Sequence, residues 1–125
     1  MLGQNNTHAN FSVNDLEEAK KFYVDVLGFT VHSEDKFGLM LKSGTGSKIN
    51  IYPKEDHKAW DSTVLGIEVD DVQAAVDELA TKGVKMEVLE GMTDENGIAS
   101  DPEMGDAAWF KDPAGNWICI SNMNM

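Results

Sequence analysis

The chain has 125 residues, a length that fits one domain with one core, and its 42% hydrophobic content is ordinary for a globular protein. Its formal net charge is −12 and all 10 basic residues are lysine, which weighs against nucleic-acid binding, since that needs a basic face. No segment approaches the ~18 apolar residues of a membrane span, and no signal peptide is visible at the start. Since Cys119 is the only cysteine, no intrachain disulfide forms and we expect a cytoplasmic protein.

The first half of the chain predicts a strand, a helix and three further strands. Asn14 is a plausible N-cap with Glu17 three residues on, and Gly28 is a natural stop for the helix. The apolar residues between these points recur at helical spacing. After the helix, apolar and polar residues alternate as they do in strands. We predict strands at about 7–13, 29–33, 37–41 and 48–52, and a helix over 15–27.

The second half of the chain predicts the same order of elements. Asp70 is the equivalent N-cap with Gln73 three residues on, and Gly83 ends the helical stripe. We predict strands at about 63–69, 84–89, 107–110 and 116–120. The long glycine-bearing loop over 90–105 is a candidate lid, because a loop of that length in a compact domain is usually functional or mobile.

The two halves are copies of one supersecondary unit. The segments 10–16 and 66–72 both run from a short alternating strand into a helix start. The offset in residue number between the two copies is constant, because it is the same from Val13 to Val69 as from Asp15 to Asp71. We therefore predict one α+β domain over residues 1–125, built from two βαβββ modules at about 7–53 and 62–121 that form a cleft or half-barrel.

Two phrases carry a family resemblance. The segment 22–29 has the pattern Phe-Tyr-x-x-x-Leu-Gly-Phe, and 112–116 reads Asp-Pro-Ala-Gly-Asn. With the two module openings they resemble the vicinal oxygen chelate superfamily, the fold of glyoxalases, bleomycin-resistance proteins and extradiol dioxygenases, over about Thr7 to Ser121. The resemblance implies the fold and a small-molecule ligand. It does not imply one reaction, because the superfamily contains both enzymes and metal-free binders.

The resemblance also implies where a metal would be held. Metal-dependent members carry four ligands on inward strand positions, which fall here on His8, Asn50, Val64 and Cys119. Hard divalent metals want carboxylate and imidazole ligands, and Val64 donates nothing. A soft metal on His8 and Cys119 would lack two protein ligands. We therefore predict no metal and no other cofactor, with an atypical divalent-metal site as the alternative.

Strand alternation defines the candidate ligand-binding residues, since residues two apart share a face of a sheet. A lone histidine such as His8 is more typical of a hydrogen-bonding pocket residue than of a catalyst. Cys119, between Ile118 and Ile120, is most simply a buried inert thiol. The predicted ligand-binding set is His8, Asn10, Asn50, Tyr52, Trp109 and Cys119.

Three functional hypotheses follow from these residues. The first is a small-molecule-binding protein that holds an apolar or aromatic ligand in the cleft without a metal. The second is a lyase, isomerase or dioxygenase relative that uses His8 with an atypical metal site. The third is a regulatory or subunit role in which the cleft is an interface. We expect no nucleic-acid or membrane partner and a homodimer, because two-fold dimers are the commonest oligomers.

Overall fold

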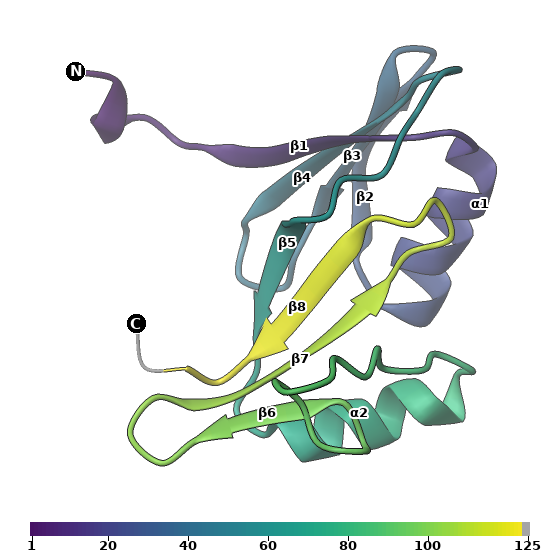
Figure 1. Ribbon diagram of the computed structural model, residues 1–125. Helices are drawn as coiled ribbons and strands as arrows, with labels where there is room; N and C mark the ends of the chain where they lie inside the picture. The colour runs from purple at the N-terminus through teal and green to yellow at the C-terminus, as the bar shows by residue number, and fades with distance from the viewer. Residues whose placement is uncertain (124–125) are drawn as a thin grey trace. The chain divides into compact units, whose positions relative to one another are not determined.

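The computed structural model describes residues 1–123. The chain divides into two compact units, the first ending at Lys58 and the second beginning at Ala59. Each unit is a βαβββ module with its own four-stranded sheet (Figure 1). The predicted α+β class with two βαβββ modules is therefore confirmed. Within the described residues, no helix is both long enough and apolar enough to cross a bilayer.

The first unit has the strand order β1-β4-β3-β2, with β1 parallel to β4 and the other neighbours antiparallel. A short 3-10 helix at Leu2–Gln4 precedes the sheet, and helix α1 continues directly into a π-helical segment. Its elements are β1 (His8–Val13), α1 (Leu16–Lys20), the π-helix (Lys21–Val26), β2 (Thr30–Asp35), β3 (Gly38–Lys42) and β4 (Lys48–Pro53).

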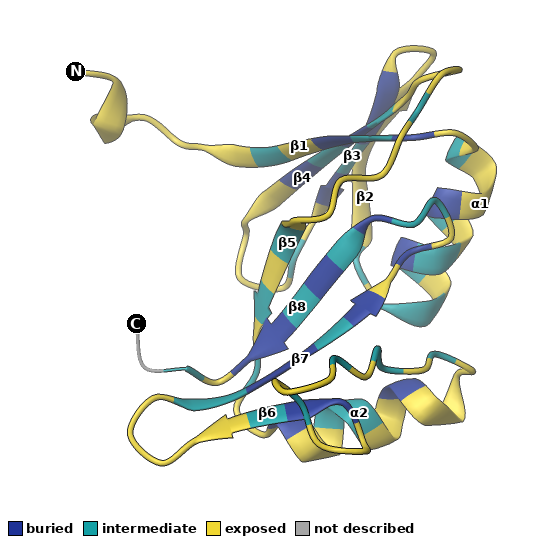
Figure 2. Ribbon diagram, in the orientation of Figure 1, coloured by how far each residue is buried: buried dark blue, intermediate teal, exposed yellow. Residues whose placement is uncertain are grey.

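One face of the first sheet packs against the helix. Tyr23 is fully buried, and its ring lies 5.9 Å from that of Phe11 between centroids. The buried strand residues alternate with exposed or half-buried ones, so they share this face. Figure 2 shows the same alternation in the colouring of β3 and β4. The core of the unit consists of Phe11, Val13, Ala19, Tyr23, Leu39, Leu41, Ile49 and Ile51.

The second unit repeats this arrangement with the strand order β5-β8-β7-β6. Strand β5 is parallel to β8, and α2 packs on the face that carries Ala108, Phe110, Ile118 and Ile120. Its elements are β5 (Thr63–Glu68), α2 (Val72–Thr81), β6 (Ile98–Asp101), β7 (Gly105–Lys111) and β8 (Trp117–Ser121).

The predicted helix caps are each wrong by one residue. Asp15, not Asn14, caps α1, because its carboxylate accepts the Glu18 N–H at 3.1 Å. Asp71, not Asp70, caps α2 by accepting the Ala74 N–H at 3.0 Å. Each true cap is a carboxylate, which also complements the positive end of the helix.

The π-helix accommodates one extra residue in the first module. Both helices end at a glycine with positive φ, 84° at Gly28 and 82° at Gly83. Thirteen positions separate the cap Asp15 from Gly28, whereas twelve separate Asp71 from Gly83. A π-turn holds more residues than an α-turn, so the segment Lys21–Val26 takes up the difference within the helix.

The predicted strand over 84–89 is wrong, and a strand lies inside the predicted loop instead. Residues 84–89 form no strand, although the Glu87 N–H donates to the Trp109 carbonyl at 2.8 Å. The edge of the sheet is β6, which pairs with β7 from Ile98↔Ala108 to Asp101↔Gly105. The hairpin of β6 and β7 closes a short loop. Pairing of β7 with residues 84–89 would close a longer loop and cost more chain entropy. The loop is therefore in part an edge strand rather than a lid.

Gly38 allows β3 to approach β4 closely, which predicts that Gly38→Ala destabilises the protein. A Cβ at this position would lie 2.9 Å from the Ile51 carbonyl oxygen, a backbone atom that cannot move aside freely. We expect a loss of about 1–3 kcal/mol of unfolding free energy in urea denaturation. Gly66→Ala is the matched control, because a Cβ there meets nothing within 4 Å. Equal effects of the two substitutions would contradict this assignment.

Candidate functional site: the helix-free sheet faces

In the first unit, the predicted site residues share the face of the sheet that carries no helix. His8 and Asn10 alternate with the buried residues of β1, and Asn50 and Tyr52 do the same in β4. Since β1 and β4 are parallel and in register, Asn10 lies beside Asn50 and Ser12 beside Tyr52. Met40 is the neighbour of Asn50 on β3. We call this surface the amide face.

Two asparagines form the centre of the amide face. The Asn50 Nδ2 donates to the Asn10 Oδ1 at 2.7 Å. In the part of the chain that the structure describes, the Asn10 Nδ2 and the Asn50 Oδ1 have no protein partner. The pair therefore presents one donor group and one acceptor on a half-exposed surface. Such groups fix the orientation of a bound molecule through hydrogen bonds.

Sequence reasoning missed His57, which joins the same face from the connector after β4. The Ser12 Oγ and the His57 Nδ1 lie 2.7 Å apart, and the His57 N–H donates to the Lys54 carbonyl at 3.0 Å. Ser12 was detectable as a face residue because it lies two positions after Asn10. The position of His57 depends on the path of an irregular segment, for which the sequence carries no periodic signal.

In the second unit, the helix-free face is aromatic. Trp109 and Cys119 are directly paired across β7 and β8, and Lys111 pairs with Trp117 at the next position on that face. The Lys111 Nζ lies 4.6 Å from the Trp117 ring centroid, within the range of a cation–π interaction. On the other side of Cys119 is Gly66, whose missing side chain leaves the thiol uncovered by a neighbour from β5. We call this surface the indole face.

Two further aromatic residues, Phe11 and Trp60, lie outside both faces. Phe11 is 6% exposed and contacts Tyr23 on the helix-covered side of its sheet. Trp60 is 73% exposed on the segment before β5. Neither residue belongs to a helix-free face, so alternation along the strands separates surface-lining aromatics from core aromatics.

Cys119 is a protonated thiol at neutral pH. Partial burial raises its pKa above the ordinary thiol value. Its Sγ lies 3.7 Å from the Ile120 carbonyl oxygen, which accepts the S–H hydrogen. A nucleophilic cysteine needs a lowered pKa, so this side chain contributes a small polarisable surface rather than a nucleophile.

Alkylation should reveal this protonation state. The folded thiol keeps its proton to a higher pH than an unfolded cysteine does. At a pH where the unfolded chain already reacts with iodoacetamide, we therefore expect the folded protein to react more slowly. We expect the pH profile of the rate, followed by mass spectrometry, to be displaced upward relative to the protein in urea. A folded protein that reacts as fast as the unfolded one at pH 7.5 would contradict the raised pKa.

The donor set at the four family positions does not fit a metal. In the first unit the positions hold the His8 imidazole and the Asn50 amide, whose nitrogen is bonded to Asn10. In the second they hold the hydrocarbon Val64 and the protonated thiol of Cys119. Among residues 1–123, no group of three His, Cys, Asp or Glu side chains lies close enough to hold a metal ion. Neither face offers the carboxylates that hard divalent ions require.

The paired βαβββ modules with helix-free faces define a class of protein, and sequence comparison gives the family. The profile of the Glyoxalase/Bleomycin resistance protein/Dioxygenase superfamily matches residues 7–120, so the chain belongs to this superfamily. The resemblance seen in the motifs over 22–29 and 112–116 is thereby confirmed. A search among proteins of curated function finds no match.

Solved structures agree with this assignment. A glyoxalase family protein from Enterococcus faecalis is 22% identical, with a TM-score of 0.72 and coverage of 97% of this chain and 99% of that one. A lactoylglutathione lyase from Agrobacterium tumefaciens is 19% identical, with a TM-score of 0.68 and coverage of 94% and 92%. TnmS3, an antibiotic binding protein from Streptomyces sp. CB03234, is 26% identical, with a TM-score of 0.67 and coverage of 96% and 98%. The first two of these structures are 22% and 19% identical to this chain, so their similarity shows the fold alone.

Proposed function

We propose that the protein binds an apolar or aromatic small molecule on a helix-free sheet face, without a metal. The observation that carries this proposal is the indole face, where Trp109, Trp117 and Cys119 form a half-exposed surface in register across β7 and β8. Aromatic side chains that remain accessible on a rigid sheet are typical of small-molecule sites. The predicted homodimer and cytoplasmic location stay predictions.

The amide face of the first unit is a second candidate surface, with fixed polar groups of its own. Small-molecule sites combine a mainly apolar surface with a few fixed polar groups. The Asn10–Asn50 pair and Tyr52 provide such groups on neighbouring positions of β1 and β4. The likeness to TnmS3, an antibiotic binding protein, supports a binding role because that protein matches nearly the whole chain.

The metal-free part of the proposal predicts that purified protein carries no stoichiometric divalent ion. A metal that binds only the folded state raises its stability by RT ln(1 + [L]/Kd), so a bound ion would be visible when removed. We expect elemental analysis to find less than one equivalent and EDTA to leave the melting temperature unchanged. One equivalent of zinc, nickel or iron that is lost in His8→Ala would overturn the proposal and favour the enzyme hypothesis.

A further inference from the structure

Three of the four strands of the first sheet lie in segments without a single acidic residue. None of the 22 Asp and Glu residues falls in residues 1–14 or 36–54, which contain β1, β3 and β4. The same segments hold four of the ten lysines, Lys36, Lys42, Lys48 and Lys54. The net charge of −12 is therefore carried entirely by the rest of the chain, and this part of the first sheet is locally cationic.

Three basic side chains form a row across the amide face. Lys48 of β4 is the register partner of His8 on β1 and of Lys42 on β3. Lys42 and Lys48 alternate with the buried residues of their strands, so they lie on the helix-free side with Asn50. Directly opposed residues of antiparallel strands have Cβ atoms about 4.5–5.5 Å apart. The two ammonium groups can therefore reach one bound group. We call His8, Lys42 and Lys48 the basic row.

The stability of the sheet does not account for the basic row. Like charges directly opposite each other on two strands are destabilising. Among the described residues, neither Lys42 nor Lys48 forms an ion pair, whereas four other lysines do. A pairing that breaks a local rule without a compensating contact is typical of a functional position.

A polar hollow of about 360 Å³ adjoins the basic row at Lys48. Its volume is within the range of small-molecule sites. The Asn5 amide is engaged within the N-terminal turn, where it donates to the Met1 and Leu2 carbonyls. The Asn6 amide and the Thr7 hydroxyl make no hydrogen bond to another described residue, so they are available as donors beside Lys48. The lining residues are Asn5, Asn6, Thr7, Gly46, Ser47 and Lys48, with no acid among them.

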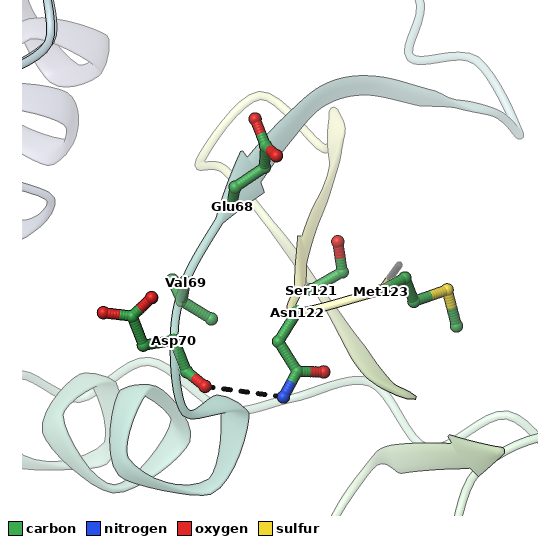
Figure 3. A pocket seen from close by; sticks show the side chains of 6 residues that line it. All are labelled: Glu68, Val69, Asp70, Ser121, Asn122 and Met123. Atoms are coloured by element: carbon green, nitrogen blue, oxygen red, sulfur yellow. Dashed lines mark hydrogen bonds between the residues drawn. The ribbon is translucent and has the colours of Figure 1, made fainter. Parts of the chain in front are cut away.

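A hollow of similar size in the second unit has the opposite charge. It measures about 350 Å³ and lies where β5 and β8 end (Figure 3). Glu68 and Asp70 line it, together with no lysine or histidine. An anion is repelled there. Of these two hollows, the one beside Lys48 is therefore the one that suits an anion.

The basic row is continuous with the asparagine pair at the centre of the amide face. Asn10 follows His8 by two residues, and Asn50 follows Lys48 by two, so the pair is the next row on the same face. Two residues along a strand cover about 7 Å. The pair presents one amide donor group and one carbonyl acceptor, which is the complement of an amide group in a ligand. Met40, beside Asn50 on β3, adds an apolar contact.

We propose that the amide face binds a carboxylate whose chain also carries an amide group. The carboxylate lies between Lys42 and Lys48, and the ligand amide lies on the Asn10–Asn50 pair. A carboxylate only accepts hydrogen bonds and a lysine only donates them, so the basic row matches it. A spacer of three methylene groups joins two such groups across about one row of the sheet. This site is independent of the aromatic site proposed on the indole face.

Two probes of equal shape test the inference. 4-Acetamidobutanoate carries the carboxylate, and 4-acetamidobutanamide replaces it with a neutral amide. In titrations followed by NMR of the labelled protein at low salt, we expect the carboxylate to bind about 5-fold more tightly, through two exposed charge interactions. Shift changes should include the backbone amides of Lys42 and Lys48. At about 1 M salt, where the screening length is about 3 Å, the preference should disappear.

Lys42→Gln with Lys48→Gln should bring the carboxylate down to the affinity of the neutral probe. The melting temperature of this variant should not fall, because the substitution removes a like-charge pair. Asn50→Ala should weaken both probes about 3-fold through lost hydrogen bonds. The matched control is Lys21→Gln with Lys36→Gln, which removes the same charge from exposed positions of the same unit, on the helix and in the β2–β3 turn. The control should retain the preference.

Several results would overturn the inference. These are equal affinity of the two probes for the unsubstituted protein, failure of both to bind, an equal loss of preference in the control, or a lower melting temperature of the Lys42 and Lys48 variant. Neither probe contains an aromatic ring, so each of these results would leave the proposed aromatic binding standing. A failure of aromatic ligands to bind would, in turn, contradict the proposed function and leave the carboxylate site standing.

Discussion

Replacing Trp109 with alanine is expected to raise the dissociation constant of a neutral aromatic ligand about 30-fold, or about 2 kcal/mol, the scale of an aromatic hot spot. Trp109 is half-buried in the middle of the indole face, paired with Cys119 and hydrogen-bonded through its carbonyl to Glu87. Its ring is therefore held in place before binding, and its removal takes away contact area. Calorimetry with 2-(naphthalen-1-yl)ethanol measures the change without relying on tryptophan emission.

Trp60→Ala is the matched control for this prediction, because Trp60 is 73% exposed and lies outside both faces. Tyr52→Ala tests the amide face of the first unit separately, and we expect a ligand of that face to bind this variant more weakly than it binds Trp60→Ala. Trp109→Phe should retain most of the affinity, since a ring remains. If Trp60→Ala matched Trp109→Ala, or if chemical-shift changes on ligand addition were confined to α1 and left the strand residues unchanged, the helix-free faces would not be the site.

Replacing Asp112 with alanine is expected to lower the unfolding free energy by about 3 kcal/mol, because buried N–H groups would lose their acceptor. Asp112 is 5% exposed, and its carboxylate accepts the Ala114 N–H, the Asn116 N–H and the Asn116 side-chain amide at 2.8–3.0 Å. Asn116 is 2% exposed, so water cannot replace the lost acceptor. Urea denaturation measures the loss.

Asp94→Ala provides the comparison, because Asp94 also accepts two backbone N–H groups, from Asn96 and Ile98 at 2.8 and 2.9 Å, but is exposed. Water replaces its carboxylate, so we expect a loss of about 1 kcal/mol. Asp112→Asn should fall between the two, since one acceptor oxygen remains. If the two alanine variants lost equal stability, burial of the 112–116 turn would not be the cause.

Most of the fold was predictable because its signals are local. Strand alternation and the glycine stops at Gly28 and Gly83 located seven of the eight strands and both helices. The pattern Val84, Met86, Val88 looks like a strand, but sheet pairing depends on which partner edge is reached with least loop entropy. A signal for β6 was present in Asp101-Pro102, since the Asp101 carboxylate accepts the Glu103 and Met104 N–H groups in the hairpin turn.

The candidate site was predictable only as a set of faces. Strand alternation alone predicted that His8 and Asn10 share one face of their sheet, and that Trp109 lies on the strand next to that of Cys119. The hydrogen bonds of Asn10 with Asn50 and of Ser12 with His57 depend on lateral register and on the path of the connector.

The helix of the first module is one residue longer between its cap and its glycine stop than that of the second. The π-helical segment takes up this residue within the helix, so the strands that follow are not displaced. An α-helix turns by about 100° per residue, so an added residue would rotate everything after it and carry the next strand's apolar side chains out of the core. The wider turn over Lys21–Val26 absorbs the addition before Gly28 is reached. The two modules therefore differ by one residue between helix cap and glycine stop, while their sheets keep the same strand order and pairing.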